Sequence, residues 1–259
     1  MSQQRMTPAQ KQVADNVVAE EGARRHHLVV HLSGAHAYGF PSHDSDLDLK
    51  SVHLAATRDL VGLTEVKPTF NRLEFVDGVE VDYTSNEAAT ALRGILRGDG
   101  NMLERLLSAD PVASDDRLAS LRPLVSDALS LKFFRHYHGF ARAQAKLVTE
   151  AEAPSAKKLL YVLRTATTGA HLLLERVCEP DLTALHERYD LPEVPELVER
   201  KRSAERGTLD EAWIARVPAL LDRVFARLGD AHERSGLPPE PPGADALDAW
   251  LIETRRQHW

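Results

Sequence analysis

The amino-acid sequence predicts an α+β fold in which a small mixed β-sheet with flanking helices is followed by an all-helical C-terminal part. Two observations carry this prediction. Runs that alternate polar and apolar residues, as half-buried strands do, occur only before residue 86. From about Asp115 onward, apolar residues recur at helical spacing and no convincing strand pattern remains.

The N-terminal elements can be assigned in order. Thr7 followed by Pro8 is typical of a helix start, and apolar spacing continues this helix to about His26. The short apolar run 27–33 predicts a buried strand. Residues 46–54 alternate polar and apolar side chains, which predicts a half-buried strand.

A hairpin and two helices come next. The alternating runs 69–76 and 79–84 flank Asp77-Gly78, a pair that strongly favours a two-residue hairpin turn. We expect Ser85 or Asn86 to cap the following helix, because short polar side chains can accept hydrogen bonds from the first free amides. A short helix is predicted over 101–108.

Helical periodicity dominates the remainder of the chain. The predicted helices span 129–150, 157–177, 197–206, 209–233 and 244–256. We therefore expect a small mixed α/β domain over 1–112 and a helical domain over 113–259, while the role of the tail 238–259 stays open.

Composition limits the class of protein. The chain has 259 residues, 43% hydrophobic and 27% charged, as in an ordinary soluble domain, and its net charge is −7. An acidic total argues mildly against a nucleic-acid partner. The sequence shows no apolar leader and no membrane-length apolar run, so the expected location is the cytoplasm, with no membrane partner. The oligomeric state stays open.

Three carboxylates suggest the chemistry. Asp46 and Asp48 lie two apart on a predicted strand, so both point to one face. Asp82 lies on another predicted strand and can join them. Neighbouring carboxylates repel one another unless a cation neutralises them, and oxygen donors suit Mg²⁺. Gly34 and Gly39 would let backbone amides approach triphosphate oxygens.

The run 33–49 (SGAHAYGFPSHDSDLDL) resembles a bacterial branch of the DNA polymerase beta-like nucleotidyltransferase superfamily, with relatives linked to RNA repair. The segments 79–85 (VEVDYTS) and 101–108 (NMLERLLS) are similar to its third-carboxylate strand and its short helix. The segments 136–141 (HYHGFA) and 157–164 (KKLLYVLR) resemble its helical half.

The resemblance implies transfer of a nucleoside monophosphate from an NTP to a hydroxyl, with two Mg²⁺ or Mn²⁺ ions and release of pyrophosphate. It implies that Asp46 and Asp48 bind both ions and that Asp82 binds the catalytic one. The expected nucleotide-binding residues are Ser33, Gly34, Ala35, His36, Tyr38, Ser45, Asn101, Glu104, Lys157 and Arg164.

Several of these assignments have a structural alternative. His36 could contact phosphate or be a capping or surface histidine. Asn101 could position substrate or cap its helix. Lys157 and Arg164 share a helix face because they are seven residues apart, and that face could hold a triphosphate or simply be solvated.

The sequence departs from the superfamily pattern at two places. Ala35 stands where the wider superfamily has a serine that holds a phosphate oxygen. Lys50 stands where arginine is more typical, so a bidentate phosphate contact at that position is in question.

The acceptor is not determined by fold, because the superfamily uses one metal core on many acceptors. We expect an RNA end, such as a tRNA-like end. One alternative is a regulatory or toxin-like adenylyltransferase that modifies a protein or tRNA. Another is a catalytically inactive nucleotide-binding interaction protein.

Overall fold

The computed structural model describes residues 6–63, 65–203 and 207–259. The chain forms two compact units, each described here by itself. The first contains Met1–His36, Ser45–Leu129 and Pro241–Trp259, and the second contains Ala37–Asp44 and Ser130–Glu240. The assignment of a catalytic domain to 1–112 and a substrate-positioning domain to 113–259 concerns roles as well as boundaries, and it stays a proposal.

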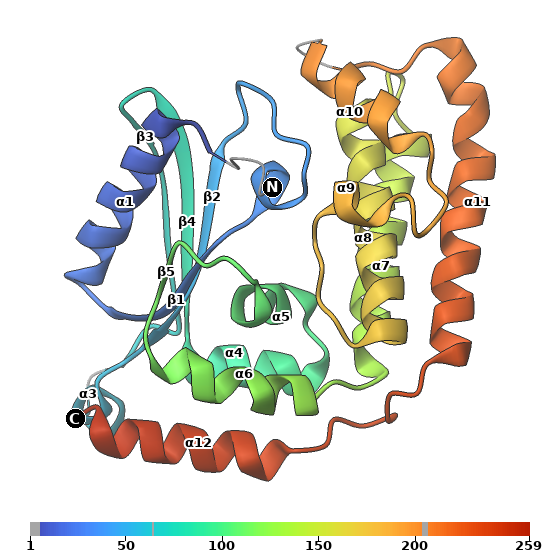
Figure 1. Cartoon of the computed structure of the whole chain (residues 1–259). Coiled ribbons are helices and arrows are strands. Elements are labelled where there is room, and N and C mark those ends of the chain that lie inside the picture. Colours follow the sequence, from blue (N-terminus) through green and yellow to red (C-terminus); the bar gives the residue numbers. More distant parts are fainter. Residues whose placement is uncertain (1–5, 64, 204–206) are drawn as a thin grey trace. The chain divides into compact units, whose positions relative to one another are not determined.

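A five-stranded mixed sheet forms the centre of the first unit (Figure 1). Its strands are β1 (His26–Leu32), β2 (Leu47–Leu54), β3 (Thr69–Val76), β4 (Val79–Glu87) and β5 (Ala113–Ser114), in the order β3-β4-β2-β1-β5. Only β2 and β4 pair in parallel; the other neighbours are antiparallel. This mixed sheet with its surrounding helices confirms the predicted α+β class.

Helix α1 (Pro8–Gly22) covers one face of this sheet. The Thr7 side chain accepts a hydrogen bond from the Gln10 amide and the Gln10 side-chain oxygen accepts one from the Thr7 amide, so a capping box starts the helix where predicted. A shared core lies between them, made by Val13, Ala14, Val17, Val30, Leu32, Leu47, Leu49, Val81 and Tyr83. The alternation of β2 thus buries Leu47 and Leu49 on this side and turns Asp48 to the other.

The opposite face of the sheet is covered by α4 (Ala88–Arg97) and α5 (Gly100–Leu107), followed by α6 (Arg117–Asp127). The prediction that Ser85 or Asn86 caps α4 is wrong, because both residues remain paired in β4. Glu87 is the N-cap instead, and its carboxylate accepts a hydrogen bond from the Ala89 amide at 2.7 Å.

The C-terminal tail completes the first unit. Helix α12 (Ala244–Gln257) contacts α4 and α6. Beyond the helix, the His258 carbonyl accepts a hydrogen bond from the Thr57 amide at 2.9 Å, where α3 (Thr57–Val61) begins. An ion pair of 3.0 Å joins Arg255 to the buried carboxylate of Glu87. The tail is therefore an integral part of this unit.

The second unit is helical. It contains α7 (Lys132–Thr149), α8 (Ala156–Glu175), α9 (Leu182–Leu185), α10 (Val194–Ser203) and α11 (Glu211–Arg234), with α8 packed against the other four. The predicted helix over 197–206 begins earlier, at Val194, and residues 204–206 lie outside the described residues. Throughout the described residues, no helix combines the length and apolarity that a membrane crossing requires.

Candidate active site

Two of the three predicted carboxylates are direct neighbours in the sheet. Asp48 on β2 and Asp82 on β4 are partners in the parallel register, so both side chains point to the same face. That face is the one opposite the α1 core, because Leu47 and Leu49 on either side of Asp48 are buried against α1. The prediction that Asp48 and Asp82 meet on adjacent strands is confirmed.

Lys50 lies between these two carboxylates. It follows Asp48 by two residues on β2 and therefore faces the same way. Its Nζ lies 3.3 Å from Asp48 Oδ1 and 2.8 Å from Asp82 Oδ2, and it donates to the Asp82 carbonyl at 3.3 Å. Sequence reasoning considered Lys50 only as a phosphate contact and missed this pairing, although the two-residue spacing on a strand indicated that Lys50 shares a face with Asp48.

The electrostatics of Asp48 show that the carboxylates influence one another. Burial raises the pKa of Asp48, and repulsion from the neighbouring Asp46 and Asp82 carboxylates raises it further, while Lys50 opposes the shift. The Asp48 side chain is 16% exposed and that of Asp82 is 40% exposed. A cation that neutralises this group would relieve the repulsion.

The donor set fits a hard divalent cation, because it consists of carboxylate oxygens that lie in register on one sheet face. Within the described parts of the chain, no three Asp, Glu, His or Cys side chains are gathered closely enough to hold a metal ion. The structure instead places the Lys50 ammonium between two of the carboxylates. Occupation by a metal would therefore require Lys50 to move.

Gly34 lies directly against the Asp48 side chain. It starts the short helix α2 (Gly34–Ala37) with a φ of +62°, in the left-handed region that favours glycine. A Cβ atom at this position would lie 1.9 Å from Asp48 Oδ2. The Ser33 amide also donates to the Asp48 carbonyl at 2.8 Å. The loop at Ser33 and Gly34, which the sequence predicted to cradle phosphates, thus lies against Asp48.

Gly39 lies close to the start of α9. Its φ is +86°, and a Cβ atom there would lie 2.0 Å from Asp181 Oδ1 and 2.6 Å from Thr183 Oγ1. The close approach at Gly39 is therefore to the start of α9 and not to a carboxylate of the sheet.

Two other residues of the predicted phosphate loop are buried. Ala35 and His36 are both 3% exposed. His36 Nε2 lies 3.4 Å from Gln10 Nε2, and Gln10 also donates to the Ser45 carbonyl at 3.4 Å. His36 is thus a buried side chain that contacts α1, and the expectation of a surface histidine is wrong.

Two predicted nucleotide-binding residues of the second unit meet. The Arg164 guanidinium lies 3.6 Å from the centre of the Tyr38 ring, and both side chains are buried. Lys157, the second residue of α8, is exposed and does not share this packing. The expectation that Lys157 and Arg164 form one charged face is wrong in this respect, because Arg164 faces the interior of its unit.

Helix α5 carries two further residues that the resemblance implied for nucleotide binding, Asn101 and Glu104. Glu104 is 5% exposed, on a helix that packs against β1 and β2, whereas Asn101 is exposed. Asn101 is not the helix cap, because Asp99 accepts the hydrogen bond from the Asn101 amide at 2.9 Å.

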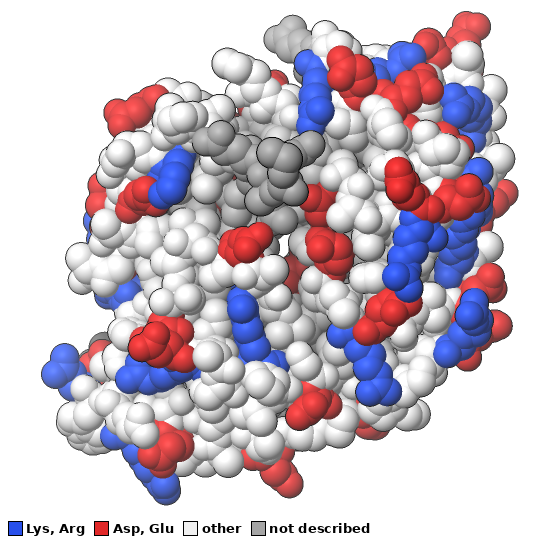
Figure 2. All heavy atoms as spheres, viewed as in Figure 1, with Lys and Arg blue, Asp and Glu red and all other residues white. Residues whose placement is uncertain are grey.

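On the described residues of the face in Figure 2, acidic and basic side chains are interspersed.

Comparison with known proteins identifies a family and two relatives. Residues 8–253 match the sequence profile of RlaP, the RNA repair pathway DNA polymerase beta family. The chain is 24% identical to MJ0002 of Methanocaldococcus jannaschii over 216 residues, which cover 83% of this chain and 88% of that protein. It is 25% identical to YcgL of Bacillus subtilis over 244 residues, or 88% of each chain.

Among solved structures, a nucleotidyltransferase-like protein from Exiguobacterium sibiricum is similar at a TM-score of 0.34 and 12% identity, over 95% of this chain and 80% of that one. The family assignment rests on the sequence profile, which spans both compact units. The chain therefore belongs to the RNA repair pathway DNA polymerase beta family.

Proposed function

We propose that this protein transfers a nucleoside monophosphate from an NTP to a hydroxyl group at an RNA end. The observation that carries the proposal is the juxtaposition of Asp48 and Asp82 on one sheet face, with Gly34 pressed against Asp48. The family to which the chain belongs is described by an RNA repair pathway, and this description supports RNA as the acceptor.

The reaction balances as a single displacement. The acceptor oxygen forms a bond to the α-phosphorus while the bond from that phosphorus to the bridging oxygen breaks and pyrophosphate leaves. Asp82 is the more exposed of the two register partners, and in this proposal it receives the proton of the attacking hydroxyl. Asp46, Asp48 and Asp82 would hold two Mg²⁺ or Mn²⁺ ions, which supply positive charge to the triphosphate and the leaving group.

The backbone at Gly34 would approach the triphosphate, because that glycine leaves room beside Asp48. The nucleotide-binding roles of Ser33, Ala35, His36, Tyr38, Ser45, Asn101, Glu104, Lys157 and Arg164 remain part of this proposal. The burial of Arg164 against Tyr38 supports an indirect role for it, as a residue that holds Tyr38 in place.

The test is a transfer assay with each α-labelled NTP, Mg²⁺ or Mn²⁺, and small RNA. The D48N/D82N variant removes two negative charges from the site. The matched control is D15N/D127N, because both of these aspartates are exposed and far along the chain from the sheet carboxylates. Thermal unfolding followed by circular dichroism verifies that all the variants are folded.

We expect label in acid-insoluble RNA with the unmodified protein and the control, and a loss of at least about a hundredfold with D48N/D82N. Label that appears on protein instead would contradict RNA as the acceptor and favour a protein-modifying adenylyltransferase. Nucleotide binding without any transfer would contradict catalysis and favour a binding protein.

A further inference from the structure

A second pocket lies at the end of β2 opposite to Asp48. It has a volume of about 590 Å³, within the usual range for small-molecule sites, and all its lining residues belong to the first compact unit. His53 lines the pocket and follows Asp48 by five residues on β2, roughly 17 Å along an extended strand. The pocket is therefore separate from the candidate active site.

The charged residues of this pocket are mostly arginines. Arg24, Arg25 and Arg58 line it, against the single carboxylate of Asp59. Arg58 Nε lies 3.8 Å from Asp59 Oδ1, which is too long for a hydrogen bond, and its side chain is 68% exposed. Arg24 is 63% exposed and pairs with Glu21 at 3.0 Å. In a chain of net charge −7, this pocket is locally basic.

Arg25 is held firmly at the inner side of the pocket. It forms an ion pair with the buried Glu21 carboxylate, and its guanidinium donates to Tyr83 Oη at 3.3 Å. The same guanidinium lies 4.3 Å from the centre of the Phe70 ring. Arg25 thus contributes charge from a fixed position, while the side chains of Arg24 and Arg58 are mostly exposed.

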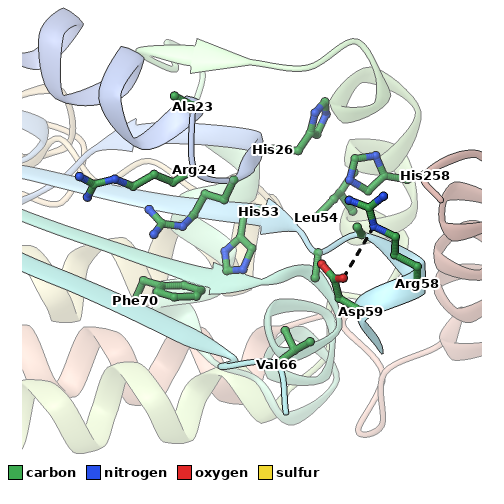
Figure 3. A pocket seen from close by; sticks show the side chains of 14 residues that line it. Ala23, Arg24, His26, His53, Leu54, Arg58, Asp59, Val66, Phe70 and His258 are labelled. Atoms are coloured by element: carbon green, nitrogen blue, oxygen red, sulfur yellow. Dashed lines mark ion pairs between the residues drawn. The ribbon is translucent and has the colours of Figure 1, made fainter. Parts of the chain in front are cut away.

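The pocket also has an apolar wall. Phe70 is half-buried and packs edge-on to His53 with ring centres 5.5 Å apart, and Val66 lies nearby in the lining. The C-terminal tail supplies His258, whose backbone is fixed by the hydrogen bond from Thr57. Figure 3 shows Arg24 at one end of the pocket and Arg58 with His258 at the other.

We propose that this pocket binds a nucleoside phosphate, either as a free nucleotide or as a phosphorylated RNA end. A guanidinium group, Arg24 at one end of the pocket or Arg58 at the other, matches phosphate oxygens in charge and planar geometry. The half-buried ring of Phe70 and the side chain of Val66 offer apolar surface to the base. Inorganic phosphate has no base, so it would contact arginine side chains and leave the apolar wall without a ligand contact.

The test is isothermal titration calorimetry in EDTA, so that no divalent ion serves the candidate active site. The probes are AMP, a short RNA with a 5′-phosphate, the same RNA without it, and inorganic phosphate. The variant R24A/R58A removes the two exposed arginines of the pocket. The matched control R97A/R256A removes two exposed arginines of the same unit that do not line the pocket.

We expect R24A/R58A to weaken AMP binding about tenfold or more, while R97A/R256A and D48N/D82N bind as the unmodified protein does. Binding that requires the RNA 5′-phosphate, and not AMP, would support the proposal with an RNA end as the source. Equal losses in both arginine variants, loss in D48N/D82N, inorganic phosphate binding as tightly as AMP, or no binding at millimolar ligand would each overturn it. The readout does not depend on transferase activity.

Discussion

Replacing Gly34 by alanine is expected to destabilise the protein and to disturb the carboxylate site together. The added methyl group would lie 1.9 Å from Asp48 Oδ2 and 2.9 Å from Asp48 Cγ, so the carboxylate has to move. The φ of +62° adds the cost of placing a side chain in the left-handed region. We expect the free energy of unfolding to fall by about 2 to 4 kcal/mol.

Gly78 provides a matched control. It has a φ of +80° in the β3–β4 turn, and a Cβ atom there would meet no heavy atom within 4 Å. G78A therefore measures the backbone cost alone, which we expect to be about 1 kcal/mol. The difference between the two variants reports the close approach between residue 34 and Asp48.

The assays are urea unfolding followed by circular dichroism and a titration with Mn²⁺ followed by electron paramagnetic resonance. We expect G34A to lose more stability than G78A and to bind Mn²⁺ more weakly than either G78A or the unmodified protein. Equal destabilisation of the two variants, with Mn²⁺ binding unchanged in G34A, would refute the inferred contact between residue 34 and Asp48.

Two further predictions follow from charge and burial. K50M removes the ammonium that pairs with Asp48 and Asp82, so we expect Mn²⁺ affinity to rise about tenfold in the same titration; weaker binding would instead mean that Lys50 holds the carboxylates in place. Burial, then repulsion from Arg25, lowers the pKa values of His27 and His53 to about 4. As the pH is lowered, the unfolded chain binds protons at these histidines before the folded chain does. The free energy of unfolding should therefore decrease as the pH is lowered from about 6.5 to about 4, by on the order of 2 to 3 kcal/mol for each histidine. H53Q should flatten the dependence of urea unfolding on pH, and an unchanged slope would contradict this account.

Much of the fold could be predicted from local pattern. The Thr7 cap, the Asp77-Gly78 turn and the alternation of β2 each depend on residues close together in the sequence, and the structure confirms them. The prediction failed where pairing overrides propensity. Ser85 and Asn86 are good caps in isolation, yet both remain in β4 because that strand pairs with β2 from Val81 to Glu87.

The candidate site shows the same division. The two-residue spacing from Asp48 to Lys50 is visible in the sequence, and it determines that both side chains share a face. The contact of Lys50 with Asp82 is not visible, because it depends on β4 lying next to β2 while β3 takes the edge of the sheet. Likewise, only packing shows that Gly39 approaches Asp181 and that Arg164 is buried.

The sequence by itself determined the class of fold and the types of most elements, and it singled out the candidate carboxylates, because helical and strand periodicity and turn chemistry are local properties. The tertiary structure decided the strand order, the register that pairs Asp48 with Asp82, and the docking of α12 that places His258 beside the second pocket. These arrangements join residues far apart in the chain, and burial and long-range hydrogen bonding select among the pairings that local pattern leaves open.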